Sequence, residues 1–183
     1  MEPASFEQEC PTGCGQFDNF NLISTKLIEE NDEDSWYCYK CRAYKYHVEL
    51  RHLTGPILIE DLILATNTGN VCVWPSEEVM TYYLLKRNKS ICEIGGGMTC
   101  MAGFFVAVSA RAKRVLLTDG SAEAMHNVAH SVIRNQQFCP NTKIDYRVLK
   151  WENTIAGHTD LKEAFHFVIC SDWYVFYINY YDN

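Results

Sequence analysis

Four short apolar segments in the second half of the chain alternate with helical segments, and this order constrains the fold most. The apolar segments are residues 90–94, 114–119, 143–151 and 165–172. Residues 98–110 and 121–136 fall between them and have the composition and apolar spacing of helices. Short apolar strands joined by helices form a parallel sheet with right-handed crossovers. We therefore predict a Rossmann-like, doubly wound α/β fold.

The segment before this alternation, residues 71–88, has the pattern of a short extended piece followed by a helix. Ser76 is a suitable cap for that helix, because its hydroxyl can accept a hydrogen bond from a free backbone N–H. Glu77 and Glu78 favour the positive end of the helix dipole. We expect this helix to lead into the first strand of the parallel sheet.

The N-terminal part of the chain has a different character. Residues 1–35 are polar and acidic, and we expect the charged run at residues 29–35 to be an exposed loop. Residues 36–52 are rich in aromatic side chains with some alternation, which is typical of strands. We predict a β-rich N-terminal extension over residues 1–67, and the α/β domain over residues 68–183.

The composition excludes several kinds of partner. The chain has 183 residues and a net charge of −7, whereas nucleic-acid binding needs a basic surface. The longest apolar run, near residues 101–110, is too short to span a bilayer, and the acidic N-terminus is no secretory signal. We therefore expect neither nucleic acid nor a membrane as partner, and a location in the cytoplasm or the nucleus.

Three consecutive glycines, Gly95, Gly96 and Gly97, follow the first predicted strand of the parallel sheet. In open α/β sheets such a loop lies where ligands bind. The dinucleotide pattern G-x-G-x-x-G requires a glycine at the position of Cys100, which disfavours a nicotinamide-dependent oxidoreductase. A P-loop requires Lys-Ser/Thr after the glycines, and the chain has Met98 and Thr99 there. The sequence therefore disfavours both a dinucleotide-binding site and a P-loop.

Two acidic residues bracket the glycines. Glu93 completes an E-x-G-x-G pattern, and Asp119 ends the second strand, 24 residues after Gly95 (119 − 95). A carboxylate at that strand end can accept hydrogen bonds from both hydroxyls of a ribose. The arrangement resembles the seven-strand class of S-adenosylmethionine-dependent methyltransferases. A tight turn without a ligand is the plainer alternative for a glycine-rich loop by itself.

Three longer segments narrow the resemblance. They are residues 67–85 (NTGNVCVWPSEEVMTYYLL), 91–110 (ICEIGGGMTCMAGFFVAVSA) and 114–128 (RVLLTDGSAEAMHNV). Together they resemble the calmodulin-lysine N-methyltransferases, within the S-adenosylmethionine-dependent protein-lysine methyltransferases. The similarity runs from about Phe17 to Asp172 and covers the front part of that fold. The resemblance implies a class I methyltransferase fold that is truncated at its C-terminus.

The resemblance also implies site residues. The cofactor-binding set would be Trp74, Glu93, Gly95, Gly96, Gly97, Asp119, Trp151 and Ser171. The catalytic residues would be Asp172 and Tyr174, which could orient the target amine. Family members often carry an aromatic residue where this chain has Val175. Trp151 has a plainer reading as a core residue, and Asp172 as the cap of a turn.

The predicted function is that of a protein-lysine N-methyltransferase that uses S-adenosylmethionine and acts on calmodulin. The alternative is a truncated, non-catalytic variant that acts as a binding protein. Calmodulin is acidic, so docking would use a local basic stretch, and residues 39–52 are the best candidate. The basic side chains of that stretch are Lys40, Arg42, Lys45, His47, Arg51 and His52.

The nine cysteines suggest an alternative kind of site, which would bind zinc. In a reducing compartment most would be free thiols. Two pairs, Cys10 with Cys14 and Cys38 with Cys41, have spacings that a four-thiolate zinc site tolerates. The methyltransferase resemblance supplies no such site, and we predict no metal ligands, with zinc as the alternative. The apolar setting of Cys92, Cys100 and Cys170 indicates core thiols.

Overall fold

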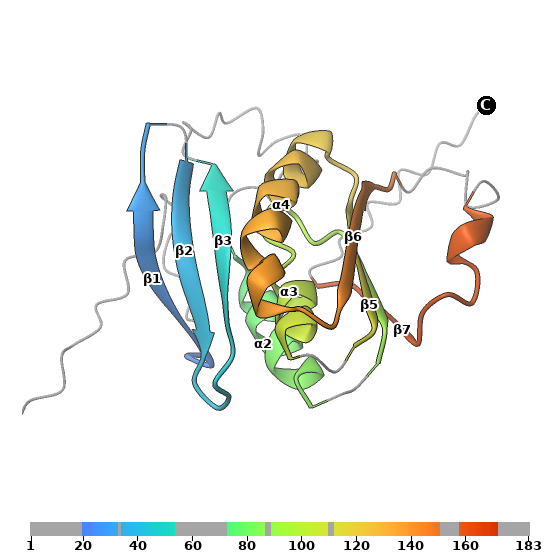
Figure 1. Ribbon diagram of the computed structural model, residues 1–183, viewed down its shortest axis with the longest axis horizontal. Coiled ribbons are helices and arrows are strands. Elements are labelled where there is room, and N and C mark those ends of the chain that lie inside the picture. Colours follow the sequence, from blue (N-terminus) through green and yellow to red (C-terminus); the bar gives the residue numbers. More distant parts are fainter. Residues whose placement is uncertain are drawn as a thin grey trace, which may run out of the picture.

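The computed structural model describes residues 20–32, 34–53, 73–86, 89–109, 112–150 and 158–171. Figure 1 shows three layers within these ranges. An antiparallel sheet lies on one side, three helices lie in the middle, and a parallel sheet lies on the other side. The mixed α/β fold with a parallel sheet was predicted, and it is confirmed as consistent with the class I methyltransferase fold.

The parallel sheet has four strands, in the spatial order β6-β5-β4-β7. Their bounds are Ile91–Ile94 (β4), Arg114–Asp119 (β5), Lys143–Val148 (β6) and Phe167–Ile169 (β7). All three strand pairs are parallel. The chain first adds β5 and β6 on one side of β4 and then returns to place β7 on the other side. The strand order therefore reverses at β4, which creates a crevice at the carboxyl ends of β4 and β7.

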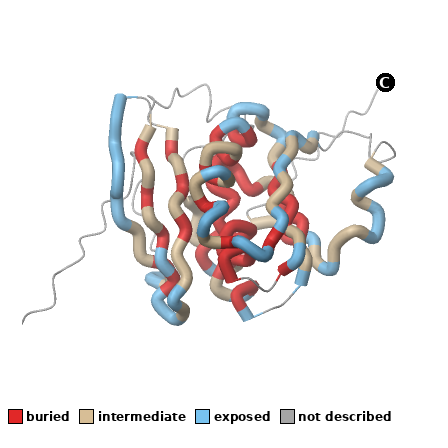
Figure 2. Tube along the Cα trace, in the orientation of Figure 1, coloured by how far each residue is buried: buried red, intermediate tan, exposed pale blue. Residues whose placement is uncertain are grey.

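The helices are α2 (Pro75–Leu84), α3 (Met101–Val108) and α4 (Ala122–Asn135). All eight residues of α3 are buried, as its apolar sequence predicted. Figure 2 shows buried residues in the helical layer and on strands of both sheets. The predicted cap at Ser76 is wrong. The N-cap position of α2 is Trp74, and Pro75 opens the helix because its fixed φ suits the first turn. None of the described helices is long and apolar enough to span a membrane.

The antiparallel sheet contains β1 (Ile23–Glu30), β2 (Asp34–Cys41) and β3 (His47–Leu53) in sequence order. The prediction of strands over residues 36–52 is confirmed. The prediction of an exposed loop over residues 29–35 is wrong in part, because this run contains the end of β1, a tight turn and the start of β2. Asn31 closes the turn, since its side chain accepts a hydrogen bond from the Asp34 backbone N–H and donates one to the Asp34 carboxylate.

A row of polar side chains on α4 covers the open edge of β3, and we call this contact the β3–α4 seam. The Asn135 amide accepts a hydrogen bond from the Glu49 backbone N–H and donates one to the Glu49 carbonyl oxygen. The Ser131 hydroxyl accepts from the Arg51 N–H, and the Asn127 amide donates to the Arg51 carbonyl oxygen. These side chains occupy the place that another strand would take, so the edge presents no free hydrogen-bonding groups here.

The basic stretch at residues 39–52 is exposed only in part. Its exposed basic residues lie near the turn between β2 and β3: Lys40, Arg42 and Lys45. Arg51 forms an ion pair with Asp34, with 2.5 Å between Nε and Oδ2. His52 is buried because strand alternation turns its side chain toward the core, where Nε2 lies 2.8 Å from the Tyr39 hydroxyl.

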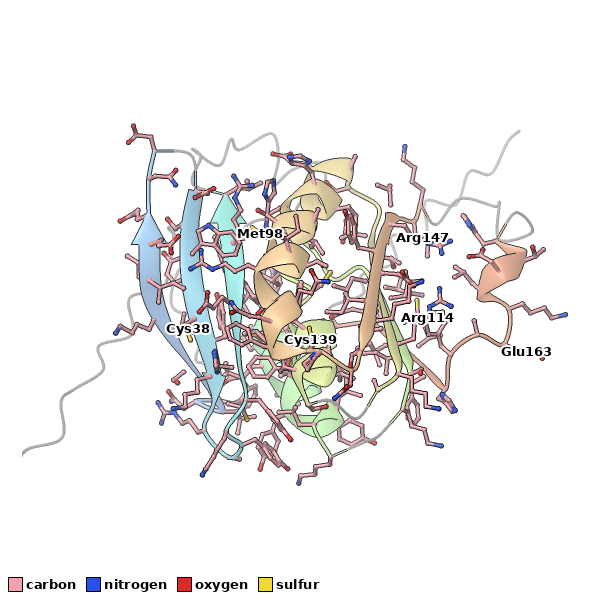
Figure 3. All side chains as sticks on the ribbon, viewed as in Figure 1. Cys38, Met98, Arg114, Cys139, Arg147 and Glu163 are labelled. Atoms are coloured by element: carbon pink, nitrogen blue, oxygen red, sulfur yellow. The ribbon has the colours of Figure 1, made fainter. Side chains whose placement is uncertain are left out.

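The face of the parallel sheet that points away from the helices carries charged side chains. Figure 3 shows Arg114 and Arg147 on this side. Arg114 pairs with Asp145 at 3.0 Å, and Arg147 pairs with Asp160 at 2.9 Å. The short helical turn Thr159–Leu161, which contains Asp160, is therefore tied to β6 by an ion pair.

Candidate active site

A small, open hollow lies at the reversal of the strand order. Its lining residues are Trp74, Glu77, Gly95, Gly96, Gly97 and Ser171. They come from the start of α2, the loop after β4 and the segment after β7. In open α/β sheets this crevice is where ligands bind. The position of the hollow therefore makes it the candidate active site.

The backbone of the glycine loop, residues 95–100, has an unusual conformation. Gly95 and Gly97 have φ values of 67° and 59°, which favour glycine, and Cys100 has a φ of 44°. Gly96 is needed for space, because a Cβ there would lie 2.5 Å from the Cys100 Sγ. The loop closes through a 2.8 Å hydrogen bond from the Cys100 N–H to the Gly96 carbonyl oxygen. Two glycines supply the turn and the third supplies a close approach.

Asp119 supports this loop from the end of β5. Its Oδ2 accepts a hydrogen bond from the Gly97 N–H at 2.9 Å, and its Oδ1 accepts one from the Ser121 N–H at 2.8 Å. Asp119 is not among the residues that line the hollow. A carboxylate has about four acceptor positions, so each oxygen keeps room for one more donor. The loop-bracing role of Asp119 was not predicted from the sequence.

Glu93 lies beneath the loop and is 1% exposed. Its Oε2 accepts a 2.9 Å hydrogen bond from the Gly103 N–H, whereas its Oε1 has no hydrogen-bond partner among the described residues. Burial raises the pKa of Glu93 to about 8; the charges of Glu77 and Asp119 also raise it, and the Gly103 hydrogen bond opposes the shift. The side chain is therefore mainly protonated at neutral pH.

Glu77 is the lining residue that the sequence analysis missed. It is 5% exposed, and its Oε1 accepts a 2.9 Å hydrogen bond from the Thr99 hydroxyl in the glycine loop. Its place near the start of the helix predicted only an interaction with the helix dipole. The available signal was its spacing, since Trp74 and Glu77 are three residues apart and so share one side of the helix start.

The structure brings five of the predicted site residues together around the hollow: Trp74, Gly95, Gly96, Gly97 and Ser171. Glu93 and Asp119 contact the loop from below and from the side. The other predicted residues, Trp151, Asp172 and Tyr174, lie outside the described residues.

The cysteine pair on β2 does not have the geometry of a zinc site. Cys38 and Cys41 are three residues apart in one strand, so their side chains point to opposite faces of the sheet. Cys41 is buried and Cys38 is half-buried, and both are free thiols. Cys10 and Cys14 lie outside the described residues. The two thiols of β2 therefore cannot coordinate one ion together.

Comparison with known proteins supports the resemblance to protein-lysine methyltransferases. Residues 59–181 match the family described as "Lysine methyltransferase". A calmodulin-lysine N-methyltransferase of Arabidopsis thaliana is 29% identical over 111 residues, which is 58% of this chain and 36% of that protein. The chain thus spans little more than a third of this relative. Methyltransferases of such families generally use S-adenosylmethionine. Because the family match covers more than half of the sequence, the chain belongs to the lysine methyltransferase family.

Proposed function

We propose that this chain binds S-adenosylmethionine in the hollow and that the site serves the methylation of a lysine side chain in a protein. The observation that carries the proposal is the charge of the hollow. Its described lining combines three glycines with the carboxylate of Glu77 and contains no lysine or arginine. A pyrophosphate there would be repelled by the Glu77 carboxylate, whereas a sulfonium cation suits an acidic site.

The residues present fit this cofactor. The backbone of Gly95 and Gly97 leaves a cradle without side chains for the amino-acid part. Trp74 would flank the cofactor at the start of α2, and Asp119 would accept hydrogen bonds from the ribose hydroxyls with its remaining lone pairs. The resemblance assigns the adenine side to Trp151. Ser171, at the end of β7, would lie next to the transferred group.

The bound cofactor supplies a methyl group on a sulfonium sulfur. The chain has to present a lysine amine to it in line and in neutral form. Free lysine has a pKa near ~10.4, so the site must lower this pKa by desolvation and let the proton leave. Asp172 and Tyr174 are the proposed residues for orienting the amine. Alignment of the two groups supplies much of the rate without a metal or a covalent nucleophile.

Calmodulin is the proposed protein substrate, because the Arabidopsis relative carries that name. The exposed basic residues near the β2–β3 turn, Lys40, Arg42 and Lys45, form the proposed docking surface, which we call the basic hairpin. The ring centroid of Tyr44 in this hairpin lies 6.2 Å from that of Tyr82 in the last turn of α2. The basic hairpin therefore lies at the opposite end of α2 from Trp74. A substrate that uses both would have to extend along this helix, over about 15 Å.

Calorimetry with S-adenosylhomocysteine tests the cofactor assignment. We expect binding at one site per chain and no binding of a nicotinamide dinucleotide. Asp119→Ala should weaken binding, because it removes the brace of Gly97 and the acceptor for the ribose. Well-folded chain that does not bind S-adenosylhomocysteine would contradict the proposal.

Radiolabelled methyl transfer to calmodulin tests the reaction itself. Incorporation of label into lysine supports an enzyme. Cofactor binding without incorporation favours the alternative, a binding protein that does not catalyse the reaction.

A further inference from the structure

Among the described residues that line the hollow, Glu77 is the one with an ionisable side chain. The other lining residues are glycines, one tryptophan and one serine. A carboxylate that is 5% exposed is poorly screened by water, so it interacts strongly with a cationic ligand group beside it. The Thr99 hydroxyl donates a hydrogen bond to Oε1 and orients the side chain.

Two elements hold the Glu77 side chain in place. Pro75 and the N-cap residue Trp74 fix the start of α2, and Glu77 lies in its first turn. Thr99 belongs to the glycine loop, so the hydrogen bond ties the helix to the loop that forms the other wall of the hollow. The carboxylate is therefore positioned before any ligand binds, which reduces the entropic cost of binding.

The neighbouring Glu78 shows what a purely structural glutamate does in this helix. It is 4% exposed, and its two oxygens accept hydrogen bonds from the backbone N–H groups of Phe20, Leu22 and Ile23. These bonds fix the start of β1 against α2. Glu78 is not among the residues that line the hollow. The two adjacent glutamates thus face different surroundings and have separable roles.

We propose that Glu77 binds the α-ammonium group of the amino-acid part of the cofactor and so selects ligands that carry this part. The inference rests on the proposed function and adds a residue to it. A carboxylate and an ammonium form a charge-assisted hydrogen bond, which is roughly twice as strong as a neutral one. Glu77 lies beside the three glycines, where the backbone leaves room for the end of a ligand.

The lysine substrate also carries an ammonium group, but it is the less suitable partner. A carboxylate next to an amine stabilises the charged form and raises the pKa of the amine. Methyl transfer requires the neutral amine, so this contact would oppose the reaction. The α-ammonium of the cofactor stays charged throughout, and Glu77 can hold it without that penalty.

Two calorimetric probes separate the proposed role from a structural one. S-adenosylhomocysteine carries the α-ammonium group, whereas 5′-methylthioadenosine has the same nucleoside and lacks the amino-acid part. In Glu77→Gln the amide oxygen can still accept from Thr99, but the negative charge is gone. We expect Glu77→Gln to weaken S-adenosylhomocysteine binding about tenfold or more, and to change 5′-methylthioadenosine binding less than twofold.

Glu78→Gln is the matched control, since it makes the same change at the next buried position of α2. We expect it to lower the melting temperature and to leave the ratio of the two affinities unchanged. Equal weakening of both probes by Glu77→Gln would overturn the proposal and leave Glu77 as a brace of the loop. Unchanged binding of S-adenosylhomocysteine would overturn it as well.

A measurement on the unmutated chain covers the case in which Glu77→Gln does not fold. The deaminated analogue of S-adenosylhomocysteine keeps the carboxylate and loses the ammonium group. We expect it to bind about tenfold or more weakly than S-adenosylhomocysteine. Equal affinity would overturn the role of Glu77 while the proposed function stands. If the folded chain binds neither probe, the proposed function fails, and this inference fails with it.

Discussion

The β3–α4 seam and the glycine loop meet at one residue but have opposite character. Asn127 donates hydrogen bonds to the Arg51 carbonyl oxygen in the seam and to the Met98 carbonyl oxygen in the loop. Figure 3 shows Met98 beside α4 and β3. In the seam, polar side chains satisfy backbone groups of an ordinary strand. In the loop, three residues have positive φ, and beneath it one oxygen of the buried Glu93 carboxyl group has no hydrogen-bond partner among the described residues.

This difference separates stability from binding. The seam attaches the antiparallel sheet to the rest of the fold and contributes nothing to the lining of the hollow. The loop contains energetically costly features of the kind that cluster at ligand sites. Changes in the seam should therefore reduce the free energy of unfolding without changing ligand affinity. Changes in the loop should reduce both.

The largest effect is expected for Asn135→Ala in the seam. The Asn135 side chain is fully buried and satisfies both the N–H and the carbonyl oxygen of Glu49. Losing both bonds should lower the free energy of unfolding by about 2–4 kcal/mol, measured by urea denaturation. Gln137→Ala, at an exposed residue with one 3.3 Å hydrogen bond, is the control and should change it by less than about 0.5 kcal/mol. A fall in S-adenosylhomocysteine affinity of folded Asn135→Ala would break the proposed separation.

The second largest effect concerns pH and involves Glu93. Its pKa of about 8 lies above the ordinary value of 4.5, so the folded state holds the proton more tightly than the unfolded state. Its contribution to stability is fully present below pH 4.5 and is lost as the pH rises through 8. We expect the free energy of unfolding to fall by about 2 kcal/mol between pH 6.5 and pH 8. Glu93→Gln should remove this slope, and an unchanged slope in this variant would refute the assignment.

His52 in the antiparallel sheet should give the opposite slope. Burial lowers the pKa of His52 from 6.5 to about 4, so the folded state holds the proton less tightly than the unfolded state. Its contribution to stability is fully present above pH 6.5 and is lost as the pH falls through 4. Between pH 4.5 and pH 6.5 this slope opposes that of Glu93, so His52→Gln should make the free energy of unfolding fall with rising pH in this window and leave the slope between pH 6.5 and pH 8 intact. Glu93→Gln and His52→Gln thus separate two opposing contributions to the pH profile.

A smaller effect on stability is expected for Gly97→Ala in the glycine loop. A side chain at a φ of 59° costs about 1–2 kcal/mol, and the strain would also disturb the N–H that Asp119 holds. Gly120→Ala is the matched control, because its φ is ordinary and its Cβ would meet only the Leu149 carbonyl oxygen, at 3.9 Å. We expect Gly97→Ala to weaken S-adenosylhomocysteine binding and Gly120→Ala to leave it unchanged. Similar affinities in the two variants would show that the loop conformation does not determine binding.

The parallel sheet and its loop could be predicted because their signals are local. Apolar segments of four to six residues, α3 with its apolar sequence and three adjacent glycines each act within a short window. The charged run at residues 29–35 misled the prediction, because Glu29 forms an ion pair with Arg134 on α4, 105 residues away. Local charge could not show that a distant helix stabilises this strand end.

The seam was not predicted and the position of Glu77 at the hollow was missed, because both depend on how elements dock and spacing alone is a weak signal. Asn127, Ser131 and Asn135 contact residues 76 to 86 positions earlier in the chain. Glu77 and Glu78 look alike in the sequence, and only the packing of α2 places one at the hollow and the other against β1. The boundary at residue 67, the location in the cytoplasm or the nucleus and the roles of Trp151, Asp172 and Tyr174 stay predictions.

The smallest effect on the fold is expected at the basic hairpin. Lys45 is exposed, so Lys45→Glu should change the free energy of unfolding by less than about 0.5 kcal/mol and leave S-adenosylhomocysteine affinity unchanged. If the hairpin docks an acidic substrate, the charge reversal should raise the KM for calmodulin several-fold at low salt, with a smaller effect at high salt because the interaction is screened. Lys113→Glu, an exposed residue immediately before β5, is the control. Equal KM values for the two variants would exclude the hairpin and direct the search for the docking surface to the other faces of the molecule.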